Sequence, residues 1–362
     1  MRIQSNKINL TGQNIYVGFD VHKNDWKVTI MTESITHKTF SQPPSPDILH
    51  AYLAKNFPDC TYHSVYEAGF CGYWIHNRLI ELGLNSIVVN PADIPTTGKE
   101  RDQKTDKRDS IKLARSLRAQ ELTPIYVPSL KSIEDRSLVR YRSILVKDLT
   151  RCKNRIKSFL HFHGIHVPDT FKNSHWSNKF IIWLQNIEMK EQTGKMTLDN
   201  MLEAALKLRE TLLKVTKQVQ TLSKTPSYKT SVELLRSISG IGIITAMILL
   251  TEFENIQRFS NTDQLCGFVG LVPSTKSSGD KDGTGNLTSR GHSFLRSTLI
   301  ESAWIAARVD PSLSLCYSKY CRRMKPNEAI IRIAKKLVSR INFVLKNNCK
   351  YDYTKNLQHT KP

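Results

Sequence analysis

Two acidic side chains, Asp106 and Asp109, stand three residues apart in the stretch TDKRDSIKLARSLRAQEL, residues 105–122. This stretch is predicted to be a helix, and side chains at positions i and i+3 of a helix lie on one face. Two carboxylates held that close repel each other, and hard divalent cations such as Mg²⁺ prefer carboxylate oxygens. The ordinary alternative is that Asp106 caps the helix and Asp109 interacts with the dipole of its first turn.

The residues around these two acids are basic, which favours a metal site that acts on phosphate over a simple helix cap. The basic neighbours are Lys104, Lys107, Arg108, Lys112, Arg115 and Arg118.

Two further acids end predicted strands: Asp20 in GFD, at the end of residues 15–21, and Glu67 in YEAG, within residues 61–68. Ligands of open α/β sheets bind at the carboxyl ends of the strands. Four carboxylates that converge from two strand ends and one helix are the pattern of a two-metal phosphoryl-transfer centre. Each acid alone is weak evidence, because an Asp after a strand is often a turn former. The predicted Mg²⁺ ligands are Asp20, Glu67, Asp106 and Asp109.

A Gly- and Ser-rich loop near the C-terminus presents Ser277 and Ser278, and Arg290, His292 and Arg296 follow it. A hydroxyl on a mobile loop can attack phosphorus while guanidinium groups stabilise the developing charge. The sequence near the loop has no Ser–His–Asp signature, so a hydrolase triad is not indicated. A flexible surface loop without chemistry is the alternative.

The elements that must position the four acids lie within residues 15–125, after a flexible arm over residues 1–14. Strands are predicted over residues 15–21, 26–32, 38–41, 61–68 and 85–90, and helices over residues 47–56, 73–82 and 105–122. Three strands followed by strand–helix alternation predict a mixed α/β sheet with helices packed on it.

The rest of the chain is predicted to be mainly helical. A basic helix over residues 129–162 and an apolar-periodic helix over residues 197–222 could pair as a hairpin or coiled coil, in a middle region of residues 126–228. An ordinary helical linker and a dimerising arm both remain open. Residues 229–348 predict a mainly α C-terminal domain, and residues 349–362 a tail.

The charge of the chain points to a polyanionic partner. The sequence of 362 residues carries 53 Lys and Arg against 32 Asp and Glu, a net charge of +21. No apolar run approaches the roughly 18 residues that span a bilayer, and the N-terminus lacks the apolar core of a signal peptide. The seven cysteines are scattered without a CxxC pair, which favours a reducing compartment. We therefore expect a cytoplasmic protein that binds nucleic acid and no membrane.

Several segments resemble one known family. GFDVHKNDWKVTI, YEAGFCGYWIHNRLIELG and TDKRDSIKLARSLRAQEL closely resemble the N-terminal domain of the DEDD insertion-sequence transposases, insertion-sequence family one-ten with its Piv-type DNA invertase relatives. LLRSISGIGIITA, FSNTDQLCGFVGLVPSTKSSG and LTSRGHSFLRSTLIESA resemble the family's second conserved domain. Both blocks occur in the family's order and spacing, over residues 15–122 and 232–310.

The resemblance implies a RuvC-like, ribonuclease-H-type fold for the first domain and places the family's DEDD acids on the four residues already selected. It also implies a catalytic serine before a glycine, which Ser278 and Gly279 match, with Ser277 as the adjacent alternative. Family members commonly continue with another glycine, where this chain has Asp280.

By the same resemblance, the chain is expected to be a transposase or site-specific recombinase that mobilises an insertion sequence through a phosphoserine intermediate. A non-coding bridge RNA would pair with donor and target DNA, and a homodimer or tetramer would join the two sites. One alternative is a RuvC-like nuclease or resolvase that cuts with metal-activated water. The other is a non-catalytic nucleic-acid-binding scaffold.

Overall fold

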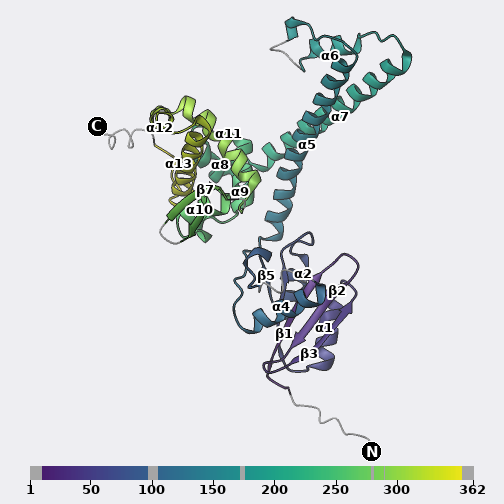
Figure 1. Ribbon diagram of the computed structural model, residues 1–362, viewed down its shortest axis with the longest axis vertical. Helices are drawn as coiled ribbons and strands as arrows, with labels where there is room; N and C mark the ends of the chain where they lie inside the picture. The colour runs from purple at the N-terminus through teal and green to yellow at the C-terminus, as the bar shows by residue number, and fades with distance from the viewer. Residues whose placement is uncertain (1–9, 97–104, 172–175, 279–280, 289, 353–362) are drawn as a thin grey trace, which may run out of the picture. The chain divides into compact units, whose positions relative to one another are not determined.

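The computed structural model describes residues 10–96, 105–171, 176–278, 281–288 and 290–352, and among these the side chains of residues 275–278 and 281–286 are not described. The chain divides into two compact units, Met1–Val127 and Pro128–Pro362. In Figure 1 the first unit runs from purple to blue and the second from blue-teal to yellow. Each unit is described by itself.

A five-stranded mixed sheet forms the centre of the first unit. Its strands, in order across the sheet, are β3 (Thr36–Gln42), β2 (Trp26–Met31), β1 (Asn14–Val21), β4 (Thr61–Glu67) and β5 (Asn85–Val89). The strands β1, β2 and β3 are antiparallel neighbours, whereas β4 runs parallel to β1 and β5 parallel to β4. The predicted mixed α/β sheet is therefore confirmed, and the carboxyl ends of β1 and β4 meet at one edge.

Helices cover both faces of this sheet. They are α1 (Pro46–Asn56), α2 (Trp74–Glu81) and α4 (Asp106–Arg118), with a 3₁₀ turn η1 (Pro91–Asp93) after β5. Alternate residues of β1, including Ile15 and Phe19, are buried in one core with side chains of α1 and α2. On the opposite face, Val65 of β4 packs against Leu113 of α4. Because successive side chains of a strand point to opposite faces, Asp20 and Glu67 share the face that α4 covers.

Gly18 lets α4 lie directly on β1. A Cβ atom at this position would stand 2.2 Å from the backbone nitrogen of Ala114 and 2.5 Å from the carbonyl oxygen of Ser110, so no other residue fits without moving the helix. Beside this contact, the hydroxyls of Ser110 and Thr29 are hydrogen-bonded at 2.9 Å and buried. The two contacts fix where the first turn of α4 lies over the sheet.

The second unit begins with a long antiparallel helical hairpin. Its helices are α5 (Leu130–Phe162), α6 (Asn178–Gln185) and α7 (Gln192–Leu222), with a 3₁₀ turn η2 (Asp169–Phe171). Apolar side chains of α5, among them Ile156, are buried in one cluster with α7 side chains such as Leu198, and Arg142 donates to the Thr216 hydroxyl at 2.9 Å. Helix α7 begins at Gln192, earlier than the predicted start at residue 197. The sequence did not predict this first part of the helix because residues 192–196 show no apolar periodicity.

The remainder of the second unit is a helical core. It contains α8 (Lys229–Arg236), α9 (Ile243–Phe253), η3 (Ile256–Arg258), α10 (Thr262–Val269), α11 (Ser293–Val309), α12 (Pro311–Cys321) and α13 (Pro326–Lys346). Met247, Leu265, Leu299 and Leu337, from four of these helices, are buried together. Among the described helices, none is both long enough and apolar enough to cross a bilayer.

The prediction of a Gly- and Ser-rich loop is wrong for most of this segment. The segment is a β-hairpin of β6 (Pro273–Ser278) and β7 (Lys281–Leu287). The register pairs Ser278 with Lys281 and Ser277 with Asp282. The hairpin escaped sequence analysis because its strands are polar and Gly-rich, so neither shows the apolar alternation by which strands are recognised. Gly279 and Asp280, on which the predicted Ser-Gly motif depends, lie outside the described residues.

Candidate metal centre and serine hairpin

The two strand-end acids lie on neighbouring parallel strands. The register of β1 and β4 pairs Gly18 with Val65, and Asp20 and Glu67 each come two residues further along their strands. They therefore stand at the same edge of the sheet and on the same face, the one that α4 covers. Both carboxylates are partly buried.

The helix brings its two acids in from above this face. Thr105 is the N-cap of α4, since its hydroxyl accepts a hydrogen bond from the Arg108 backbone N–H at 3.4 Å. Asp106 is therefore the first helical residue rather than the cap. With the cap supplied by Thr105, the structure does not support the simple capping explanation for Asp106, whose carboxylate points elsewhere.

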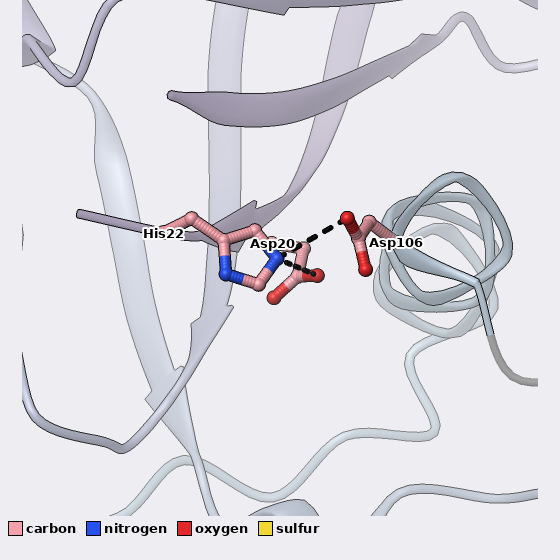
Figure 2. A group of neighbouring side chains, drawn as sticks. All are labelled: Asp20, His22 and Asp106. Carbon is pink, nitrogen blue, oxygen red and sulfur yellow. Dashed lines mark ion pairs between the residues drawn. The ribbon is translucent and has the colours of Figure 1, made fainter. Parts of the chain in front are cut away.

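That carboxylate meets β1 through a histidine. The His22 Nε2 atom lies 3.2 Å from an Asp20 carboxylate oxygen and 3.3 Å from an Asp106 carboxylate oxygen (Figure 2). Potential ligand atoms of the three residues all lie within 4.8 Å of one another. Their side chains are 24% exposed for Asp20, 47% for His22 and 58% for Asp106, so solvent and a substrate can reach them. We refer to Asp20, His22 and Asp106 as the acid centre.

The other two predicted ligands are not members of this group. Asp109, one helical turn beyond Asp106, pairs with Lys112 at 3.4 Å, and the two side chains are only 13% and 11% exposed. Glu67 ends the strand beside β1. The structure thus unites Asp20 with Asp106 and places Glu67 and Asp109 on the same side of the sheet, while the metal-binding role of all four stays a prediction.

His22 was not among the predicted site residues. It lies in the HKND segment, between the strands predicted over residues 15–21 and 26–32. However, His22 comes two residues after Asp20, and residues i and i+2 of an extended chain point to the same side. That spacing was the available signal.

The donor set of the acid centre suits a divalent cation. Two carboxylates supply the oxygen ligands that hard cations such as Mg²⁺ and Mn²⁺ bind, and a neutral imidazole is acceptable to Mn²⁺ and to softer ions. The His22 Nε2 atom lies between one oxygen of Asp20 and one oxygen of Asp106. A cation bound at this position would contact the same two carboxylates.

The base of the serine hairpin is tightly built. Gly270 and Gly291 face each other so closely that a Cβ atom at Gly291 would lie 2.5 Å from the Gly270 Cα. The Arg296 guanidinium donates to the carbonyl oxygens of Gly270 at 3.2 Å and of Thr288 at 2.8 Å. Arg296, considered from the sequence as a group that could stabilise charge on phosphorus, thus holds the two ends of the hairpin together, and its role toward phosphate stays a prediction.

Two models of known protein families match the chain, and both describe transposases. A transposase model of the DEDD IS110 type matches residues 17–165, and a model described as the transposase IS116/IS110/IS902 family matches residues 232–318.

Individual relatives agree with these models. The chain is 33% identical to y4qE of Sinorhizobium fredii over 66% of its own length, but it spans only 57% of the length of that protein. It is 29% identical to the transposase for insertion sequence element IS1533 of Leptospira borgpetersenii, covering 69% of this chain and 72% of the other. A second S. fredii protein, y4rJ, is 26% identical over 90% of both chains.

Proposed function

The chain belongs to the IS110-type family of transposases, and from this premise we propose that it cuts and rejoins DNA to move an insertion sequence. The observation that carries the proposal is the acid centre: two partly exposed carboxylates, one from a strand end of the mixed sheet and one from the helix α4, with the imidazole of His22 against both. The first unit is proposed to have a RuvC-like, ribonuclease-H-type fold, which the strand order β3-β2-β1-β4-β5 supports.

The proposed metal ligands are Asp20 and Asp106, with Glu67 and Asp109 completing the set. Bound there, Mg²⁺ would withdraw charge from a phosphate oxygen and lower the cost of attack at phosphorus. The protein's own part is to hold the acids in position: Gly18 and the Ser110–Thr29 hydrogen bond fix α4 over β1, so that Asp106 meets Asp20 without rearrangement.

The proposed nucleophile is Ser278, with Ser277 as the adjacent alternative. The serine Oγ forms a bond to phosphorus while one deoxyribose oxygen leaves and takes up the hydroxyl proton. The hydroxyl of another strand end then attacks the phosphoserine, returns the proton to the serine and closes a new phosphodiester, so no water is consumed. The placement of the serine at the tip of β6 in a hairpin clamped at its base by Arg296 supports this role.

Two partners follow from the same proposal. By resemblance to the family, a bridge RNA pairs with donor and target DNA, so that base pairing selects the sequence and the protein contacts mainly backbone. The net charge of +21 supports this division of tasks. A dimer or tetramer would hold both DNA sites, and the serine of one subunit would serve the carboxylates of another.

The test is to trap the covalent intermediate. Purified protein with its co-purified RNA is incubated with Mg²⁺ and a labelled, nicked DNA substrate, and protein-linked label is measured on a denaturing gel. Ser278→Ala is expected to abolish the adduct and strand exchange while DNA binding stays intact. Ser277→Ala tests the adjacent alternative: loss of the adduct in this variant alone would assign the nucleophile to Ser277. Full adduct formation in both variants would refute the serine role.

A second candidate function is a RuvC-like nuclease that uses water, favoured by one observation: the acid centre is assembled entirely within the first unit. It predicts Mg²⁺-dependent free DNA ends, no adduct, and undiminished cutting by Ser278→Ala. The same gel therefore separates the two functions.

A further inference from the structure

A hollow of about 330 Å³ lies in the second unit between α5 and the start of α11. It is lined by Arg140, Ser143, Ile144, Lys147, His292 and Phe294. We call it the α5 notch. None of its lining residues belongs to the acid centre or to the serine hairpin.

The Arg140 side chain in this notch is held from behind by a buried carboxylate. Glu252 of α9 is 2% exposed and accepts two hydrogen bonds from Arg140, Nε to Oε1 at 2.6 Å and Nη2 to Oε2 at 2.8 Å. Such a two-point pair fixes the plane of the guanidinium. Arg140 is nevertheless 47% exposed, so an oriented cationic group faces solvent.

His292 is fixed by the same carboxylate. Its Nδ1 atom accepts a hydrogen bond from the Leu295 backbone N–H at 3.3 Å, which caps α11, and its Nε2 atom lies 3.2 Å from Glu252 Oε2. We assign the proton to Nε2, because Nδ1 acts as the acceptor. The ring therefore forms a rigid wall of the notch next to the residues that follow the serine hairpin.

The charges around the notch do not cancel. Glu252 carries one negative charge, and Arg136 at 3.6 Å, only 14% exposed, offsets it from the inner side. Arg140 then contributes positive charge toward the notch, and Lys147, exposed on α5, adds a second. A solvated basic face of α5 would also be positive, but it would not require a buried carboxylate to set the direction of one guanidinium. Ile144, 50% exposed, and Phe294 supply an apolar side next to these cations.

We propose that the α5 notch binds one phosphodiester of a nucleic-acid strand, with Arg140 and Lys147 on the phosphate oxygens and Phe294 and Ile144 against the adjoining sugar or base. Oriented Arg with a flexible Lys suits a tetrahedral oxyanion, and aromatic side chains next to cations are typical of strand-binding grooves. This site deepens the proposed function, on which it rests: it would hold a strand at a fixed distance from the serine hairpin, through His292 at the hairpin's C-terminal side.

The test measures binding of short fluorescein-labelled strands, one of DNA and one of RNA, to the full chain by anisotropy between about 50 and 200 mM salt. Lys147→Glu is the primary variant, because Lys147 is exposed and its loss leaves the Glu252 pairs intact. Lys214→Glu, on an exposed position of α7 outside the notch, makes the same change of net charge and is the control. Arg140→Lys keeps the charge but loses the two-point pair.

Lys147→Glu is expected to weaken binding about three- to tenfold relative to Lys214→Glu and to reduce the slope of log K against log salt by about one. Arg140→Lys is expected to weaken binding at unchanged net charge. A strand with a neutral methylphosphonate backbone should bind wild type and Lys147→Glu equally. An effect confined to RNA, or to DNA, assigns the strand that occupies the notch.

Equal affinities and equal salt slopes for Lys147→Glu and Lys214→Glu, with both the DNA and the RNA strand, would refute phosphate binding in the α5 notch. A difference in affinity between wild type and Lys147→Glu that persists with the neutral methylphosphonate strand would also refute it. Neither outcome touches the serine proposal, because binding is measured without strand exchange. Conversely, if no covalent protein–DNA adduct formed and the serine proposal were refuted, the expected results of these binding measurements would stay the same.

Discussion

The acid centre can be compared with the buried Glu252 and its partners Arg136, Arg140 and His292, which we call the Glu252 cluster. Both contain carboxylates and a histidine, but they have opposite roles. Each places a histidine Nε2 atom 3.2 Å from a carboxylate oxygen. In the acid centre two carboxylates share one imidazole and all three side chains are 24% exposed or more. In the Glu252 cluster one carboxylate, 2% exposed, receives contacts from two arginines and a histidine.

The contrast shows how the balance of carboxylates and cationic side chains determines whether a site can bind a cation or an anion. Where two carboxylates lie close together and solvent has access, a divalent ion can bind both and relieve their repulsion. Where cations outnumber the carboxylate, the carboxylate is already satisfied, so it orients the cations and stabilises the fold. The first arrangement is therefore suited to chemistry and the second to structure and anion binding.

The largest effect expected from this contrast is on catalysis, at the acid centre. Asp106→Asn should lower Mg²⁺-dependent strand cleavage by about a thousandfold, because a metal ligand supplies several kcal/mol and each 1.4 kcal/mol is tenfold in rate. Since Asp106 is 58% exposed, the melting temperature should stay within about two degrees of wild type. Cleavage is measured with saturating DNA, and melting by circular dichroism.

The control for this variant is Asp25→Asn, an exposed acid in the turn between β1 and β2, close in sequence to Asp20 but outside the acid centre. It should cleave as wild type does. If Asp106→Asn retained full activity, or lost it only by unfolding, the distinction between an exposed functional cluster and a buried structural one would fail.

The buried cluster should show the reverse behaviour, a loss of stability. Burial raises the pKa of Glu252, but hydrogen bonds from His292 and Arg140 outweigh it and lower the pKa to about 2, from an ordinary value of 4.5. Because the folded pKa is below the unfolded one, the stabilisation is complete above about pH 4.5 and is lost as the pH falls toward 2. A shift of this size corresponds to about 3 kcal/mol.

Glu252→Gln should therefore lower the unfolding free energy of the second unit by about 3 kcal/mol at pH 7, with the difference from wild type shrinking between pH 4.5 and 2. Urea unfolding at several pH values measures it. Glu233→Gln, at an exposed position of α8, is the control and should change stability by less than about 0.5 kcal/mol. A gap between wild type and Glu252→Gln that widened toward low pH would contradict the assigned sign.

The sequence predicted the first unit's fold well because its signals are local. The alternating apolar residues of β1 and the i,i+3 pair of acids in α4 are both set by a few neighbouring positions, and the mixed sheet followed from the order of such segments. The β6–β7 hairpin was missed because its pairing depends on backbone hydrogen bonds between polar strands. No side-chain pattern reports those bonds.

The candidate sites show the same difference between signals that are local in the sequence and contacts between remote residues. Asp20 and Asp106 were selected from strand ends and helix spacing, and the structure brings them together through His22, which was not among the predicted site residues. Glu252 was overlooked because its partners are remote in the chain: Arg140 is 112 residues away. A lone acid inside the apolar run IITAMILLTEF was the available signal, since a buried carboxylate requires partners.

The smallest expected effect concerns the imidazole that distinguishes the acid centre from a purely carboxylate site. If His22 contributes a nitrogen ligand, it should favour Mn²⁺ over Mg²⁺, because imidazole suits transition ions better than it suits Mg²⁺. His22→Ala should then weaken Mn²⁺ binding about tenfold while changing Mg²⁺ binding by less than about threefold.

Titration calorimetry on the full chain without DNA measures both affinities, independently of activity. His50→Ala, on α1 and outside the acid centre, is the matched control. If instead the imidazole only separates the two carboxylates and leaves when a cation enters, its removal should tighten both ions alike, and the ratio of the two affinities decides between a ligand and a placeholder.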